Sequence, residues 1–146
     1  MDAFKIADVQ INEDDFAPAS DGKHNCKIVV AEDKANSANT GRYVLVEFKI
    51  VGGPDNGKRV RDYCTHKHAN PKAVAAGFGR LKRIMQGAGI EEIKDESDLL
   101  GLTLSITTEV EELAEDSPYK PQARVRRYEV WDNSLVSGDD SEEVAF

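Results

Sequence analysis

The stretch from residue 41 to residue 64 constrains the fold of this chain more than any other. From Tyr43 to Ile50, residues of inward and outward type alternate with a period of two, which is typical of a half-buried strand. Six turn-forming residues follow at positions 52–57, and the chain returns as a second alternating run from Lys58 to Cys64. The pattern therefore predicts a β-hairpin with one face in the core. The predicted inward residues are Val44, Val46, Phe48, Ile50 and Val60.

Three more strands and one helix are predicted outside this hairpin. Alternation predicts strands at 23–31, 102–110 and 123–131, the last with a bulge at Arg126-Arg127, and a polar loop at 32–41. Asn70-Pro71 is a helix start signal, and the glycines at 87 and 89 supply the end. Gly77 and Gly79 each cost the helix up to ~1 kcal/mol relative to Ala, which close packing on the sheet would explain.

The predicted order is three strands, one helix and two strands, an all-β class with one helix. This β-β-β-α-β-β order is that of the OB-fold, a five-stranded Greek-key barrel. A small α+β sheet with the same order is the alternative. We expect an acidic N-terminal arm at 1–21, an OB-fold domain at 22–131 and a disordered acidic C-terminal tail at 132–146.

Charge is distributed unevenly along the chain, whose 146 residues carry a net charge of -8. Residues 1–21 hold six acids and one base, and residues 132–146 hold five acids and no base, so 22–131 carries +2. Residues 40–83 hold ten Lys or Arg and three acids. Because a local basic field governs the encounter with a polyanion, the distribution favours a nucleic-acid partner. The alternative is an acidic interaction protein or DNA mimic, which would spread acids over its body.

The outer face of the hairpin combines cations with aromatic rings. Cations neutralise phosphates, and a flat ring stacks on an unpaired base at roughly 1–3 kcal/mol per base. The second and third strands are part of the binding face of OB barrels. The alternative is an ordinary solvated strand face, which has a similar composition. The predicted DNA-binding residues here are Arg42, Tyr43, Lys49, Lys58, Arg59, Arg61 and Tyr63, with Lys34, His66 and Lys67 in the adjoining segments.

A second cationic group leads into the last predicted strand. It consists of Lys120, Arg124, Arg126 and Tyr128, with Arg127 and Trp131 beside them, and would extend the same binding groove. The alternative places Tyr128 or Trp131 in the core and pairs the arginines with acids of the preceding strand. Those acids are Glu109, Glu111 and Glu112. The sequence leaves both arrangements open.

Motifs for catalysis, cofactors and metals are not found. There is no nucleophile elbow, phosphate loop or metalloprotease motif, so we expect neither an enzyme nor a cofactor. Zinc would need four thiolate or imidazole ligands at paired spacings, which two Cys and three His do not supply, so no metal is expected. Cys26 and Cys64 lie in strand-like runs and are predicted to be reduced core thiols. Without a signal peptide or membrane span, we expect a cytoplasmic protein. Its assembly is expected to be a monomer or a homodimer, and the sequence does not decide between them.

The end of the chain is an acidic run that closes with Val-Ala-Phe. A charge run with Gly and Ser is usually solvated and disordered. A terminal aromatic on a flexible anionic string, however, can dock into an apolar slot ringed by Lys and Arg. The predicted partner-binding residues are Asp139, Asp140, Glu142, Glu143 and Phe146.

Several short motifs together suggest a family. They are Lys34 with Gly41-Arg42-Tyr43, the strand end at 48–52, Asn56-Gly57-Lys58-Arg59, Asn70-Pro71 and the segment 81–89. In these, the region from Gly22 to Trp131 resembles phage-encoded proteins long catalogued as a domain of unknown function and associated with single-stranded DNA binding. The tail is similar to those of bacterial and phage single-stranded-DNA-binding proteins.

The resemblance implies a sequence-nonspecific single-stranded-DNA-binding protein on an OB barrel, acting in the cytoplasm of a phage host. It also implies a tail that occupies the binding face when DNA is absent and recruits replication or recombination proteins when DNA displaces it. An RNA-binding OB module is a weaker alternative, which matched DNA and RNA strands would separate.

Overall fold

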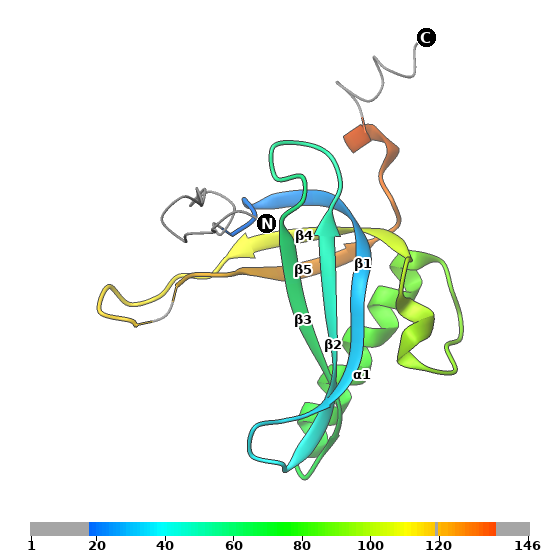
Figure 1. Cartoon of the computed structure of the whole chain (residues 1–146), viewed down its shortest axis with the longest axis vertical. Helices are drawn as coiled ribbons and strands as arrows, with labels where there is room; N and C mark the ends of the chain where they lie inside the picture. Colours follow the sequence, from blue (N-terminus) through cyan, green and yellow to red (C-terminus); the bar gives the residue numbers. More distant parts are fainter. Residues whose placement is uncertain (1–17, 119, 137–146) are drawn as a thin grey trace, which may run out of the picture.

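A computed structural model describes residues 18–118 and 120–136 of the chain. Within them a sheet of five strands is combined with one α-helix and two short 3₁₀ turns (Figure 1). The elements are β1 (Gly22–Ala35), β2 (Gly41–Ile50), β3 (Arg59–His68), α1 (Pro71–Ala88), η3 (Glu96–Leu99), β4 (Thr103–Val110), β5 (Ala123–Glu129) and η4 (Asn133–Val136).

The five strands form one antiparallel sheet in the order β3-β2-β1-β4-β5. Residues 22–27 of β1 pair with β4, and residues 26–35 pair with β2. The pairing of β1 with β2 has a register shift between Ile28 and Val30. Because a bulge bends and twists its strand, β1 curves from one layer into the other, and β4 and β5 cross β2 and β3 steeply (Figure 1). The result is a curled half-barrel, mostly β with one helix.

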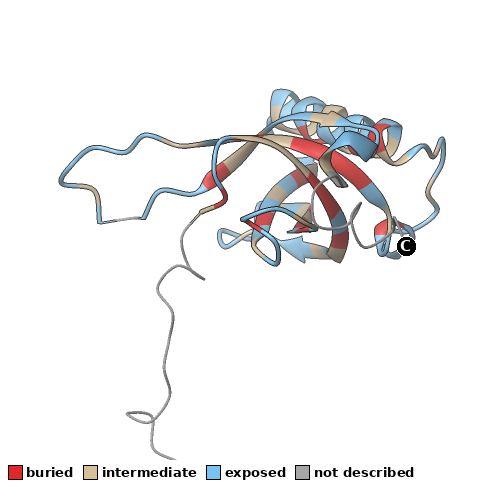
Figure 2. Cartoon of the chain, turned by 90° about the horizontal axis from the view of Figure 1, so that it is seen from above, coloured by how far each residue is buried: buried red, intermediate tan, exposed pale blue. Residues whose placement is uncertain are grey.

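The core lies on the concave side of this sheet. Val46 and Phe48 of β2 are fully buried, as are Leu104 and Ile106 of β4, and Ile84 of α1 completes the cluster. Figure 2 shows buried residues along the strands and exposed residues along the loops and much of α1. The predicted inward face of the hairpin is therefore confirmed, and with it the register of β2 and β3.

Two strands are longer than their sequence pattern predicted. β1 continues to Ala35, so the predicted loop at 32–41 shrinks to residues 36–40, and β3 continues to His68. These polar extensions pair with β2, because ladder hydrogen bonds stabilise a strand even where neither face is apolar. The predicted bulge in β5 is confirmed, since the register shift opposite Thr107 and Thr108 leaves Arg126 without a partner position.

Helix α1 begins and ends at the predicted signals. The Asn70 side chain accepts a hydrogen bond from the Lys72 amide, and Gly89 adopts the left-handed conformation at φ 77°. At Gly77 an added Cβ would lie 1.9 Å from the carbonyl oxygen of Thr65, so the helix backbone touches β3 there. At Gly79 nothing lies within 4 Å. Close packing therefore explains Gly77 and does not explain Gly79.

Both ends of the described chain are fastened to the half-barrel. Ala19 is buried, and the Ser20 hydroxyl donates to the Asp55 carboxylate at 2.5 Å. After β5, the Asp132 amide donates to Asn25 Oδ1 at 3.0 Å, and Asn25 Nδ2 donates to the Asp132 carbonyl oxygen at 2.8 Å. The body thus extends to η4, beyond the boundary predicted at residue 131. Most of the N-terminal arm and the predicted partner-binding residues of the tail lie outside the described residues.

In the described part of the chain, no helix is both long and apolar enough to cross a membrane.

Candidate functional site

A row of three cations crosses the convex face of the half-barrel. This face is turned away from the core, and we call it the outer face. Lys27 of β1 lies opposite Lys49 of β2, and Lys49 lies opposite Arg59 of β3. Directly opposed residues point to the same side of a sheet, so the three side chains lie side by side. All three are exposed, and neither lysine has an ion-pair partner in the part of the chain that the structure describes. We call this set the cationic row.

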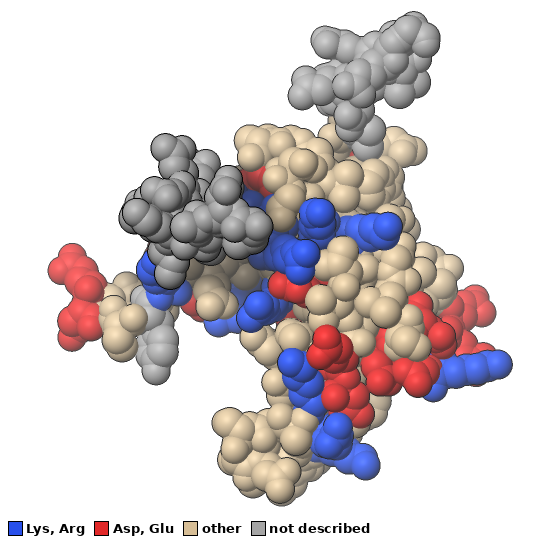
Figure 3. Space-filling model, in the orientation of Figure 1, with Lys and Arg blue, Asp and Glu red and all other residues tan. Residues whose placement is uncertain are grey.

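One carboxylate anchors Arg59 of this row and the neighbouring Arg61. Glu47 is buried, and its two oxygens bind Arg59 Nη1 at 3.2 Å and Arg61 Nε at 3.3 Å. The hydrogen bond that Arg61 donates to the Glu47 carboxylate raises the pKa of Arg61. The guanidinium groups stay exposed, at 51% and 59% of the side chain, so they are held in place without being covered. Four cations and one carboxylate thus leave this region positive, and Figure 3 shows Lys and Arg gathered there.

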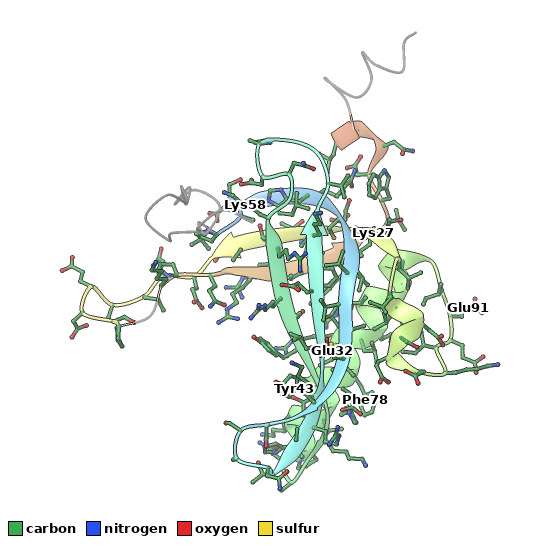
Figure 4. All side chains as sticks on the ribbon, viewed as in Figure 1. Lys27, Glu32, Tyr43, Lys58, Phe78 and Glu91 are labelled. Carbon is green, nitrogen blue, oxygen red and sulfur yellow. The ribbon has the colours of Figure 1, made fainter. Side chains whose placement is uncertain are left out.

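A pair of tyrosines follows lower on the same face. The rings of Tyr43 and Tyr63 meet edge to face, with centroids 5.5 Å apart and planes at 72°. Tyr63 is 38% exposed, and Leu45 lies opposite it on β2. Figure 4 places Tyr43 and Lys27 toward opposite ends of the outer face. The face therefore offers charge at one end and flat aromatic surface at the other.

A groove of about 660 Å³ continues from Arg59 and Arg61 over the edge of β3 toward the start of β5. We call it the edge groove. On its β3 side, Lys58 Nζ lies 3.1 Å from the Asp55 carboxylate, so that lysine is paired. The edge groove is lined by Pro18, Glu47, Gly57, Lys58, Arg59, Val60, Arg61, Pro121, Gln122 and Ala123.

The predicted cations at the far end of the hairpin are mostly neutralised. Asp33 Oδ1 lies 3.1 Å from Arg42 Nε and 2.9 Å from His66 Nε2, and the hydrogen bond from His66, with that from Arg42, lowers the pKa of Asp33. Lys34 lies 3.5 Å from Glu32. Lys67 is exposed and has no ion-pair partner among the described residues. This end contributes little free positive charge.

The second predicted group follows the alternative arrangement in large part. Arg124 of β5 pairs with Glu111, the residue that follows β4, at 3.0 Å, and Arg126 pairs with Glu109 of β4 at 3.5 Å. Lys120 is exposed in the connection between these strands. The group is therefore not a continuous cationic extension of the outer face.

Tyr128, predicted to bind DNA, lies on the core side of the sheet. Its ring packs on Phe48 at 6.2 Å, and its hydroxyl donates to the Asp62 carboxylate. Burial raises the pKa of Asp62, which lies 3.9 Å from Arg80 Nε. Because its hydroxyl and ring contact core neighbours, Tyr128 supports the sheet beneath the outer face and is not part of that face.

Sequence reasoning missed Lys27 as a site residue. Lys27 sits between the buried Cys26 and Ile28, so alternation alone places it on the outer face. Its role emerges only from the register, which sets it opposite Lys49. A prediction of which residues of β1 and β2 oppose each other would have found it.

The two cysteines are buried and free, and burial raises the pKa of each thiol to about 12. They are therefore core residues, as predicted, and poor nucleophiles. No group of three or more His, Cys, Asp or Glu side chains positioned to hold a metal ion occurs among the described residues.

A family model described as "Protein of unknown function (DUF669)" matches residues 3–116. The chain belongs to this family. The part shared with DUF669 runs from the N-terminal arm through β1, β2, β3, α1 and β4, so it contains the whole cationic row and ends before β5. The comparison with curated proteins found no match to the chain.

Proposed function

We propose that this DUF669 protein binds single-stranded DNA without sequence preference and protects exposed strands. The observation that carries the proposal is the cationic row beside the exposed Tyr63 on one sheet face. Groups that track a backbone, placed next to aromatic rings that accept bases, are what single-strand binders combine.

The topology supports an OB-type barrel as the scaffold. The sheet order β3-β2-β1-β4-β5 brings the two edge strands of the curled sheet toward each other, and α1 connects β3 to β4. An OB-fold is a partly open five-stranded barrel whose strands 2 and 3, with the loops after strands 1 and 4, bind oligonucleotides. The cationic row, the tyrosine pair and the edge groove all involve β2 or β3.

Binding follows from two kinds of contact on this face. Neighbouring strands lie about 4.8 Å apart, so Lys27, Lys49 and Arg59 form a closely spaced series that can follow one phosphate backbone. Bases directed toward Tyr63 and Tyr43 would stack on the tyrosine rings, and only unpaired bases can do so. A duplex offers phosphates but encloses its bases, so the face should prefer a single strand. A DNA mimic would instead present carboxylates where this face presents four cations around Glu47.

The C-terminal tail completes the proposal. Residues 137–146 lie outside the described residues, and their acids and terminal Phe146 suit competition for the cationic face and recruitment of replication or recombination proteins. A tether of about ten residues keeps such a string near millimolar effective concentration, enough to displace weak ligands. We assign this activity to the cytoplasm of a phage host.

Titration of fluorescein-labelled oligo(dT) and a matched duplex tests the proposal. We expect the single strand to bind at least about tenfold more tightly, because stacking adds roughly 1–3 kcal/mol per base. Lys27→Ala with Lys49→Ala should weaken binding, whereas Lys72→Ala with Lys82→Ala, two exposed lysines of α1, serves as the control of equal charge. Equal affinity for both DNA forms, or equal loss in both variants, contradicts the proposal. Matched RNA strands separate DNA from RNA binding.

A further inference from the structure

On one side, the edge groove is bordered by backbone groups of β3 that have no partner among the described residues. The Ile50 amide donates to the Lys58 carbonyl oxygen at 2.8 Å, so Lys58 and, two residues on, Val60 direct their backbone toward β2. Arg59 and Arg61 therefore direct their N–H and C=O groups away from β2, toward the groove. Tyr63, two residues further along β3, is oriented in the same way. Its carbonyl oxygen points away from β2 and accepts a hydrogen bond from Arg80 Nη1 at 3.0 Å.

β5 borders the groove in the same way on the other side. The Glu111 amide donates to the Gln122 carbonyl oxygen at 3.0 Å, so Gln122 faces β4. The Val110 amide turns away from β5 to the Asp21 carboxylate at 2.7 Å, which leaves its partner Ala123 directed outward into the groove. Within the described residues, no ladder joins β3 to β5. Two open sheet edges thus face one groove, and proteins usually cover such edges.

The charge of the groove lining selects an anionic occupant. Lys58, Arg59 and Arg61 line it together with the carboxylate of Glu47, and Asp55 pairs with Lys58 beside the lining, so the two arginines leave a net charge of +1. A chain that lies between two open edges must itself offer backbone donors and acceptors, as an extended peptide does. The groove therefore suits an acidic peptide segment.

Such a segment begins at the groove itself. Pro18 lines the groove, and the next two residues are fixed by burial of Ala19 and by the bond from Ser20 to Asp55. Residues 1–17 contain five acids and one base, a net charge of -4, and 17 residues reach up to about 56 Å when extended. The family match begins at residue 3, so this segment belongs to the sequence shared within DUF669.

We propose that residues 1–17 occupy the edge groove, with their carboxylates against Arg59 and Arg61, and so compete with a DNA strand for the end of the cationic row. The docking stands on the open edges, the charge of the lining and the position of Pro18. The competition rests in addition on the proposed function. The acidic N-terminal segment is thus an internal ligand that a bound strand must displace.

Two charge-matched variants of the full-length chain test the docking. The first neutralises four acids of the segment, Asp8→Asn, Glu13→Gln, Asp14→Asn and Asp15→Asn. The second neutralises four exposed acids that lie outside the groove lining and make no described ion pair, Glu91→Gln, Glu92→Gln, Glu112→Gln and Glu115→Gln. Both raise the net charge by four. Amide hydrogen exchange of Arg59, Arg61 and Ala123 is followed by NMR at low salt, without nucleic acid.

We expect these three amides to exchange at least about tenfold faster in the first variant than in the parent and the second variant. Equal exchange in all three proteins overturns the proposal. Loss of protection only after deletion of 138–146 also overturns it, because the C-terminal tail would then be the occupant.

A titration with oligo(dT) distinguishes failure of the docking from failure of the proposed function. If the docking and the function both hold, the first variant binds the strand several-fold more tightly than the second at low salt. If none of the three proteins binds oligo(dT), the proposed function fails, while the exchange result still decides the docking.

Discussion

Gly77 is the position at which a single methyl group should do most harm to this fold. An Ala Cβ there would lie 1.9 Å from the Thr65 carbonyl oxygen, 2.4 Å from its nitrogen and 2.7 Å from its carbonyl carbon. Ordinary contact begins at 3.4 Å, so α1 and β3 would have to separate by about 1.5 Å. The obstacle is strand backbone, which cannot rotate away as a side chain can.

The expected cost follows from two opposed effects. Replacing Gly by Ala inside a helix favours folding by up to about 1 kcal/mol. Forcing a packed interface apart costs about 1–3 kcal/mol, occasionally more, and a backbone clash belongs at the upper end of that range. Gly77→Ala should therefore lower the free energy of unfolding by about 2 kcal/mol or more. Gly79→Ala, with nothing within 4 Å, should raise it by about 0.5–1 kcal/mol.

Urea denaturation followed by far-UV circular dichroism measures both variants against the parent. The two substitutions change the same residue type in the same helix, two positions apart, so each is the control of the other. A Gly77→Ala protein as stable as the Gly79→Ala protein would refute the close approach of α1 to β3. The reasoning would also fail if both substitutions were destabilising by the same amount.

Three further predictions concern the outer face, the core and the tail. Phe48→Ala should lower the free energy of unfolding by about 3–5 kcal/mol, whereas Tyr63→Ala should weaken oligo(dT) binding and leave stability nearly unchanged. The opposite pattern would contradict the assignment of Phe48 to the core and Tyr63 to the outer face. Burial raises the pKa of Asp62 in the folded protein above the value of 3.8 that it has in the unfolded chain. Ionisation of Asp62 therefore lowers the free energy of unfolding as the pH rises from 3.8 through the folded pKa. Asp62→Asn should accordingly be more stable than the parent at pH 7 and equal to it near pH 3 in thermal melts; a gain at both pH values would refute this cause. Deleting 138–146 should raise oligo(dT) affinity most at low salt, while Phe146→Ala should impair partner recruitment alone; unchanged affinity on deletion would make the tail irrelevant to binding.

Local patterns in the sequence were sufficient for most of the fold. Alternation from Tyr43 to Ile50 predicted which side chains enter the core, and Asn70 with Gly89 predicted the limits of α1, because each signal acts within a few residues. The ends of β1 and β3 were not predictable in this way. Polar residues such as Lys34 belong to a strand there only because another strand pairs with them.

The candidate site could likewise be predicted only where local sequence patterns determine it. Arg59, Arg61 and Tyr63 were predicted on the outer face, and they are there, since a period of two fixes the side of each residue. The partners of these residues come from tertiary structure. Glu47 anchors two arginines and Lys27 joins the cationic row through strand pairing, which only the register of β1, β2 and β3 determines.

The dependence of oligo(dT) affinity on salt tests the central claim most directly. If Lys27, Lys49, Arg59 and Arg61 each neutralise one phosphate, the slope of log K against log salt should be about -3, from roughly -0.7 per contact on a single strand. Lys27→Ala with Lys49→Ala should reduce its size to about -1.4, and the control Lys72→Ala with Lys82→Ala should leave it unchanged. A slope that is the same in the parent and in both variants would contradict the assignment of the cationic row as the DNA-binding surface.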